Sequence, residues 1–147
     1  QRKITKSPRE WAKLGVTGVN GRAVADHGKA AILLPAGGHG AAFMVFDNFR
    51  VIERYNAADA YVIGVGHLAD RIAGGPPIQA EWPRGDRALN FAERKEMQER
   101  LTARGFPTAG VDGRIGPKTT AAVRAYQLAN GLMPDGYASL DLLKRLR

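Results

Sequence analysis

A short run between residues 114 and 119 gathers side chains of this sequence that are well suited to hold a polar ligand. Arg114 and Lys118 can pair with carboxylates, and Thr119 can hydrogen-bond a peptide amide. Gln127 follows eight residues later, and its carboxamide can also bond a peptide amide. We therefore predict a ligand site that consists of Arg114, Lys118, Thr119 and Gln127.

A second polar group surrounds Tyr55 and Asn56. A phenol and an amide can hydrogen-bond a carboxylic acid, or the acetamido group of a sugar, where charge develops. The residues alone favour a simpler interpretation, in which Asn56 caps the following helix and Tyr55 packs in the core. Tyr61 lies on an apolar stripe, so packing explains it equally well. Glu53, close to Tyr55, is a candidate acid, although a solvent-facing charge on a helix explains it more simply.

Several kinds of chemistry find no support in the sequence. It contains no cysteine, which excludes disulfides, thiol nucleophiles and cysteine zinc sites. His27, His39 and His67 do not have the spacing of metal ligands. The glycine-rich run at residues 37–40 is not followed by the Gly-Lys-Ser/Thr of a phosphate loop, and no Gly-x-Ser-x-Gly elbow occurs. We expect neither a metal nor a cofactor.

The composition is that of a soluble globular chain with an excess of basic residues. Its 147 residues fit one ordinary domain or two small ones, and 22 Lys and Arg against 14 Asp and Glu give a formal net charge of +8. A spread positive charge favours polyanionic partners, such as nucleic acid, an anionic membrane or a carboxylate-bearing cell-wall polymer. The chain does not begin with Met, and we expect it to be part of a longer protein.

The elements that must position these residues form two segments. In the first, Ser7 and Glu10 have capping-box spacing, and Asp47 or Asn48 can cap a helix. Residues 30–34 and 42–46 are short apolar strands on either side of a glycine-rich turn, as in a hairpin. A helix over 58–72 follows. Its apolar residues predict one buried stripe, which consists of Tyr61, Val65, Leu68 and Ile72.

The second segment is helical. Asn90 and Glu93 predict the start of a helix over 91–104, Pro117 opens a helix over 117–129, and Ser139 can cap a last helix. Asp-Gly occurs before each of the last two helices, at 112–113 and 135–136, which is a weak internal repeat of turn chemistry. The expected fold is mainly α with a small β-hairpin. We expect domains at residues 1–82 and 89–147, joined by a linker at 83–88.

The second segment resembles the three-helix type of peptidoglycan-binding domain over residues 89–147. The pattern combines two Asp-Gly turns with an apolar helix that ends in aromatic-Gln, and Met97-Gln98, Leu101 and Gly105 match the first helix. The matching residues between 111 and 136 are Asp112, Gly113, Gly116, Thr119, Val123, Tyr126, Gln127, Gly131, Leu132, Asp135 and Gly136.

The first segment resembles the end of the lysozyme-like catalytic domain of the membrane-bound lytic murein transglycosylase B family. The supporting residues are Glu10-Trp11, Leu14-Gly15-Val16, Leu34-Pro35-Ala36-Gly37, Phe43, Asn48-Phe49, Arg54-Tyr55-Asn56, Tyr61 and Gly66-His67-Leu68-Ala69-Asp70-Arg71. The resemblance implies that Tyr55, Asn56 and Tyr61 line the catalytic cleft. Ala58 and Val62 depart from the Ser and Ala that are usual in the family.

The resemblance implies non-hydrolytic cleavage of the MurNAc-GlcNAc bond, in which one glutamic acid serves as acid and then as base and leaves a 1,6-anhydroMurNAc end. No glutamate of this chain matches the context of that acid, so the expected chain is a C-terminal portion without a catalytic residue. Whether it is itself an enzyme is left open. We expect its first segment to leave apolar surface uncovered, for packing on a missing N-terminal half, on a copy of itself or on the binding domain.

The partners implied by the resemblance are the glycan strands and stem peptides of peptidoglycan, with the stem-peptide carboxylates facing Arg114 and Lys118. The implied location is the periplasm or the outer membrane of a Gram-negative bacterium. Two alternatives remain. One is a non-catalytic peptidoglycan-binding module, and the other is a basic nucleic-acid-binding protein, which the low aromatic content of 7% and the absence of basic clustering on one helix face disfavour.

Overall fold

The computed structural model describes residues 3–147, which form two compact units. The first unit comprises the chain up to Pro35 together with Ala41–Glu81. The second comprises Trp82–Arg147 and the short loop Ala36–Gly40. None of the helices within residues 3–147 has both the length and the apolar character needed to cross a bilayer. The fold is mainly helical with one small sheet, as the sequence predicts.

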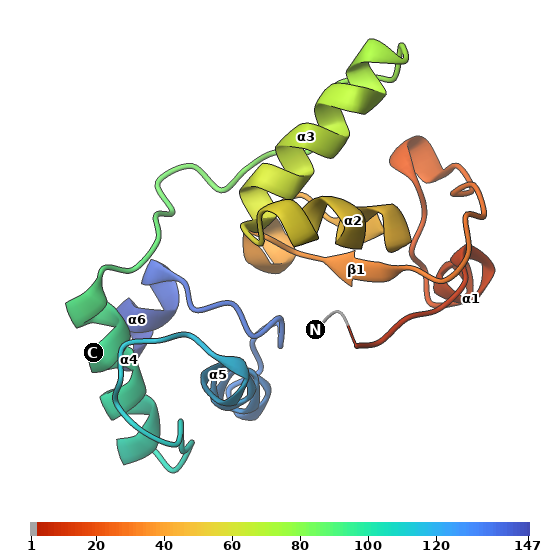
Figure 1. Ribbon diagram of the computed structural model, residues 1–147. Helices are drawn as coiled ribbons and strands as arrows, with labels where there is room; N and C mark the ends of the chain where they lie inside the picture. Colours follow the sequence, from red (N-terminus) through yellow and green to blue (C-terminus); the bar gives the residue numbers. More distant parts are fainter. Residues whose placement is uncertain (1–2) are drawn as a thin grey trace. The chain divides into compact units, whose positions relative to one another are not determined.

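The first unit begins with helix α1 (Pro8–Lys13), which starts at the predicted capping box (Figure 1). The Ser7 backbone N–H donates to Glu10 Oε2 at 2.8 Å, and the Glu10 N–H donates to Ser7 Oγ at 3.3 Å. The indole Nε1 of Trp11 donates to the Ala30 carbonyl at 2.8 Å. The Trp11 bond attaches α1 to the start of the hairpin. A 3₁₀ turn, η1 (Val19–Gly21), lies between them in the sequence.

The predicted hairpin is present. Strands β1 (Ala31–Leu33) and β2 (Phe43–Val45) pair antiparallel, with Ile32 opposite Met44, and the turn between them contains the 3₁₀ segment η2 (Gly37–His39). Helices α2 (Asp47–Tyr55) and α3 (Asp59–Ile72) follow the hairpin (Figure 1). The prediction that Asp47 or Asn48 caps α2 is wrong, because Phe46 occupies the cap position without a side-chain bond.

The core of the first unit is small. Leu33, Phe49 and Val62 are its buried residues, and Phe43, Val45, Ile52 and Ile63 pack against them. The predicted buried stripe of α3 is wrong: Leu68 and Ile72 are 60% and 80% exposed, and Tyr61 and Val65 are each 38% exposed. Helix α3 packs on α2, and its Val62 and Ile63 join the small core, so the stripe on the other side stays open to solvent. The expectation of uncovered apolar surface in this unit is thereby confirmed.

The second unit is a three-helix bundle of α4 (Phe91–Ala103), α5 (Pro117–Ala129) and α6 (Leu140–Leu146) (Figure 1). The predicted capping box of Asn90 and Glu93 is present, and Ser139 Oγ accepts the Leu142 N–H at 3.0 Å to cap α6. Buried residues from all three helices meet in one core. Its members are Leu89, Met97, Leu101, Ala122, Val123, Tyr126, Leu142, Leu143 and Leu146.

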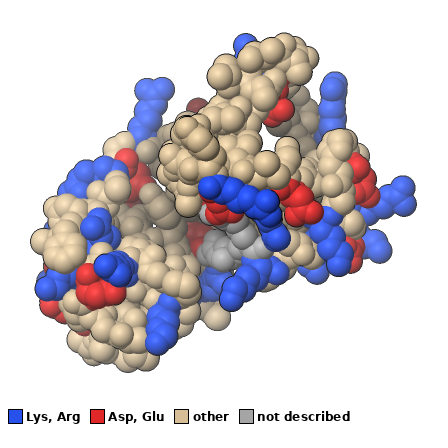
Figure 2. All heavy atoms as spheres, viewed as in Figure 1, with Lys and Arg blue, Asp and Glu red and all other residues tan. Residues whose placement is uncertain are grey.

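Charge is interspersed over the visible face of each unit. Figure 2 shows Lys and Arg side chains alternating with Asp and Glu, without one continuous basic patch on that face. Several of these charges are paired in the second unit, where Glu96 contacts Arg100 at 2.8 Å and Arg147 at 2.9 Å. A continuous phosphate-binding stripe, which nucleic-acid binding would need, is therefore not visible on this face.

Candidate functional site

The first Asp-Gly turn is held by a buried glutamine of α4. Gln98 Nε2 donates to Asp112 Oδ1 at 2.9 Å, and Gln98 Oε1 accepts the Gly113 N–H at 2.8 Å. Asp112 Oδ1 also accepts the Arg114 N–H at 2.9 Å. The donors stabilise the carboxylate and hold the pKa of Asp112 below its usual value, with the Gln98 amide as the largest cause. Gly113 has φ +70°, which favours glycine.

The second Asp-Gly turn repeats this arrangement one helix later. Gln127 of α5 donates from Nε2 to Asp135 Oδ1 at 2.7 Å and accepts the Gly136 N–H at 2.8 Å. Asp135 Oδ1 also accepts the Tyr137 N–H at 2.8 Å, and Gly136 has φ +72°. The internal repeat in the sequence is therefore a repeat of structure, in which a helical glutamine fastens the turn that leads to the next helix. The interpretation of both Asp-Gly pairs as turns is confirmed.

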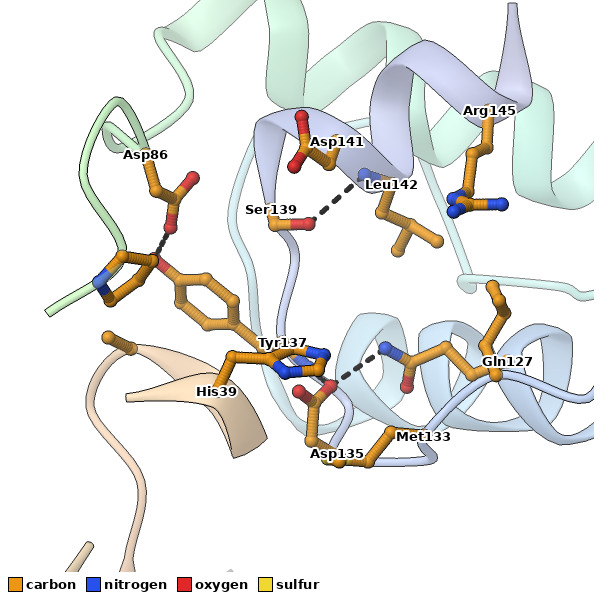
Figure 3. Close-up of a pocket in the computed structure, with 13 residues that line it drawn as sticks. His39, Asp86, Gln127, Met133, Asp135, Tyr137, Ser139, Asp141, Leu142 and Arg145 are labelled. Carbon is orange, nitrogen blue, oxygen red and sulfur yellow. Dashed lines mark hydrogen bonds between the residues drawn. The ribbon is translucent and has the colours of Figure 1, made fainter. Parts of the chain in front are cut away.

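A pocket of 230 Å³ lies beside the second turn, within the second unit (Figure 3). Helices α5 and α6, the Asp135 turn, the segment before α4 and the loop 36–40 all contribute to its wall. The lining residues are Ala36, His39, Pro83, Asp86, Gln127, Leu132, Met133, Asp135, Tyr137, Ser139, Asp141, Leu142 and Arg145. A concave site with polar groups among apolar ones is the usual form of a ligand pocket.

Most of the polar groups in this wall are already engaged within the unit. Tyr137 Oη donates to Asp86 Oδ2 at 2.9 Å, and Asp135 Oδ2 accepts the Gly38 N–H at 2.8 Å. Burial, followed by the hydrogen bond to Asp86, raises the pKa of Tyr137 to about 12, so the phenol stays protonated as a donor. Ser139 Oγ is occupied by the cap of α6.

Arg145 and His39 differ from those groups. Neither side chain forms a hydrogen bond or an ion pair with any residue in the range 3–147, and both residues are exposed. Asp141, one turn before Arg145 on α6, contacts Lys144 at 3.1 Å at the surface. The pocket therefore presents an open guanidinium and an open imidazole. This arrangement can receive an anion, and a planar carboxylate matches the guanidinium best.

The residues predicted as ligand contacts in this unit have separate positions. Gln127 lines the pocket, but its amide is used to hold Asp135 and Gly136. Thr119 is buried, where its hydroxyl contacts Gln98 Nε2 at 3.2 Å. Arg114 and Lys118 are exposed and do not line the pocket.

In the first unit, the structure brings Tyr55 and Tyr61 together. Their ring centroids are 5.9 Å apart with planes inclined by 31°, and Tyr55 is 83% exposed at the end of α2. Asn56 Oδ1 accepts the Ala58 N–H at 2.9 Å, which is an Asx turn before α3. The cap position of α3 is Ala58, without a side-chain bond, so the expectation that Asn56 caps this helix is wrong. The alternative expectation that Tyr55 packs in the core is also wrong. Glu53 is half-buried on α2. The two tyrosines form an exposed aromatic surface that a sugar ring can stack on.

A second pocket, of 480 Å³, belongs to the first unit. The chain from Gly75 to Ala80 lies along it, together with the end of α3 and the start of β2. His67 and Asp70 of α3 are the titratable groups in its wall. Most of the remaining lining residues are alanine, proline and other apolar residues, so this pocket offers few groups for the recognition of a charged ligand.

Sequence reasoning missed Arg145, Asp86 and Tyr137. Asp86 stands in the proline- and glycine-rich stretch predicted as a linker, and its contact with Tyr137 spans 51 residues. Arg145 lies among leucines at the end of the last helix, where a basic residue is usual for dipole reasons alone. The only usable signal was the helical spacing of Asp141 and Arg145, which places both on one face of α6.

Comparison with known proteins supports the family resemblance of each segment of the chain. Residues 1–70 match the transglycosylase SLT domain family, and residues 92–146 match a putative peptidoglycan binding domain family. No curated protein matches the chain. Among solved structures, SltB3 from Pseudomonas aeruginosa in complex with NAG-anhNAM-pentapeptide is 44% identical, with a TM-score of 0.93 over 100% of this chain. The complex of SltB3 with NAG-NAM-pentapeptide is 45% identical, with a TM-score of 0.91 over 98% of this chain.

The likeness extends over almost all of this chain but less than half of the other. The chain spans 40% of the SltB3 chain in the first of these structures and 39% in the second. Both units therefore have the fold of the corresponding part of SltB3.

Proposed function

We propose that this chain is part of a lytic transglycosylase that joins a transglycosylase SLT domain to a peptidoglycan-binding domain, and that it binds peptidoglycan and serves the cleavage of its glycan strands. The observation that carries the binding proposal is the pocket beside the Asp135 turn. It lies in the unit that contains the peptidoglycan-binding match, and it presents an open guanidinium and an open imidazole. The muropeptides in the two SltB3 complexes are the class of ligand that we assign to it.

The first unit is assigned the glycan side of the reaction. An exposed pair of tyrosine rings can stack on a sugar face, and Asn56 directly follows Tyr55 in the chain. In this proposal Tyr55, Asn56 and Tyr61 line the cleft in which the MurNAc-GlcNAc bond is cleaved to a 1,6-anhydroMurNAc end. They bind and orient the sugar. The proton-transferring glutamic acid is not assigned to any residue of this chain.

The site of action that we propose lies outside the cytoplasm, where peptidoglycan is found. More specifically, we propose the periplasm or the outer membrane of a Gram-negative bacterium. In the second unit, we further propose that Arg114 and Lys118, which are exposed near the first Asp-Gly turn, make a separate contact with stem-peptide carboxylates.

Cosedimentation with purified sacculi tests the binding proposal. We expect the chain to pellet with sacculi and to remain in solution with chitin, which has a related glycan but lacks stem peptides. A DNA shift assay at increasing salt provides the contrast, because non-specific binding to phosphates weakens steeply with salt. Equal recovery with sacculi, with chitin and without any polymer would overturn the proposal.

A further inference from the structure

We propose that the pocket beside the Asp135 turn recognises the free C-terminal carboxylate of a stem peptide through Arg145, and that it does not recognise the glycan. This inference rests on the proposed function and specifies which part of peptidoglycan the second unit holds. It follows from the size of the pocket, from the state of its charged groups and from the position of its open cation.

The size of the pocket favours a chain end over a disaccharide. Its 230 Å³ lies below the roughly 300–1,000 Å³ of pockets that bury a drug-sized ligand. Carbohydrate binding also favours an open aromatic face, whereas the only aromatic ring besides His39 among the lining residues is Tyr137, which is half-buried and tied to Asp86. Ala36, Leu132 and Leu142 provide apolar wall for a small side chain such as that of alanine.

Among the charged groups that line the pocket, the Arg145 guanidinium is the group open to an anion. Asp86, Asp135 and Asp141 carry the negative charges, and each already contacts a donor: the Tyr137 phenol, two backbone N–H groups and the Gln127 amide, and the Lys144 ammonium. Arg145 and His39 carry no such contact with the described residues. A carboxylate that enters the pocket therefore finds the Arg145 guanidinium available as a donor.

Arg145 has the position that this role needs. It projects from α6 at the same end of the pocket as Gln127 of α5, while Asp86 and Tyr137 lie on the opposite side (Figure 3). A guanidinium can bind a carboxylate through two parallel hydrogen bonds, which fixes the direction of the peptide as well as its end. The peptide then runs away from Arg145, past the apolar wall.

The test uses the full 147-residue chain and two probes, diacetyl-L-Lys-D-Ala-D-Ala with a free carboxyl group and its C-terminal amide. Both amines are blocked, so the probes differ only in the terminal charge. By calorimetry or NMR titration, we expect Arg145→Gln to weaken binding of the free acid about tenfold or more, as the loss of a charged hydrogen bond implies. The amide should bind both proteins equally weakly. Arg104→Gln, with the same charge change at the end of α4, should bind as wild type.

Two results would overturn the inference. One is equal binding of acid and amide by the wild type. The other is an unchanged affinity of Arg145→Gln for the free acid, together with a weaker affinity of Asp141→Asn for a peptide that carries a free amine. That combination would identify an ammonium group as the ligand. Sacculus cosedimentation of the wild type is measured alongside. If the wild type does not pellet, the proposed function fails; if it pellets and Arg145 has no effect, only this inference fails.

Discussion

Gln98 binds Asp112 by a hydrogen bond of 2.9 Å from Nε2 to Oδ1, and this contact joins helix α4 to the turn that precedes α5. The same bond recurs at 2.7 Å between Gln127 and Asp135, one helix later. Each glutamine also accepts the N–H of the glycine that follows the aspartate. A buried carboxamide is therefore the element that fixes each turn, and its removal leaves the glycine N–H without its acceptor and the aspartate with one donor fewer.

Gln98→Leu is expected to destabilise the chain by about 1–3 kcal/mol, because the Gly113 N–H loses its acceptor in a buried position. Urea denaturation followed by circular dichroism measures this. Gln98→Glu is the sharper variant, since the shape is kept while two carboxylates face each other. Its stability deficit at pH 7 should shrink as the pH falls, because protonation of the introduced carboxylate restores a donor toward Asp112. A deficit independent of pH would contradict the proposed contact.

Two glycines with similar backbone angles should respond differently to alanine. Gly105 has φ +85°, and a Cβ there would have no neighbouring atom within 4 Å, so Gly105→Ala should cost roughly 1–2 kcal/mol from backbone strain alone. Gly113 has φ +70°, and a Cβ there would lie 2.6 Å from a ring carbon of Phe91. Gly113→Ala should therefore cost about 1–3 kcal/mol more. Equal losses in the two variants would show that Phe91 does not restrict the turn.

The exposure of the apolar stripe of α3 predicts a small effect of its truncation on stability, whereas the sequence pattern predicts a large one. Leu68→Ala should change the free energy of unfolding by no more than about 0.5 kcal/mol, because Leu68 is 60% exposed. Val62→Ala, at a position that is 1% exposed, should cost about 2 kcal/mol. Thermal melts at low protein concentration compare the two. A large loss in Leu68→Ala would mean that this stripe is covered in solution.

Acid should weaken the start of α4. Bonds from Arg87 and from the Asn90 backbone lower the pKa of Glu93 from 4.5 to about 2. A pKa that is lower in the folded state means that ionised Glu93 stabilises the fold above pH 4.5, and that this contribution is lost as the pH falls toward 2. Glu93→Gln should therefore melt earlier than wild type at about pH 6, with the two curves converging near pH 2. Glu99→Gln, at an exposed site on the same helix, should not show this convergence.

Substitution of Tyr55 should affect activity without affecting stability. Tyr55 is 83% exposed, so Tyr55→Ala should leave the melting temperature nearly unchanged. If the pair stacks on a sugar, the same variant in the complete enzyme should release fewer 1,6-anhydromuropeptides from sacculi, measured by mass spectrometry. Tyr55→Phe should retain most of the activity. Full activity in Tyr55→Ala would remove this residue from the proposed cleft.

Local signals predict the elements of the fold better than their packing. Capping residues such as Ser7, Asn90 and Ser139 act within three residues of themselves, so the sequence shows their effect directly. The burial of α3 depends instead on how much of its surface the neighbouring elements cover, and periodicity does not contain that information. The apolar stripe that begins at Tyr61 has the spacing of a core face and yet lies largely in solvent.

The candidate site shows the same division. The Asp-Gly turns are evident from the sequence because glycine and aspartate have strong local preferences. The glutamines that hold them are not, because Gln98 is 14 residues from Asp112 and a helical glutamine usually lies at the surface. The pocket itself depends on contacts across much longer separations, such as that of Gly38 with Asp135. Arg145 gains its importance only from this folded environment.

In the second unit, the residues that stabilise the fold differ from those that face a ligand. Gln127 secures the chain from the buried side, whereas Arg145 faces outward from a short helix whose inner leucines are unaffected by its identity. Exchanging the outward residues of α6 should consequently retune what the module captures without loosening its framework. Such exchanges on α6 could turn this small domain into a reagent that separates cell-wall fragments by the terminal group of their peptides.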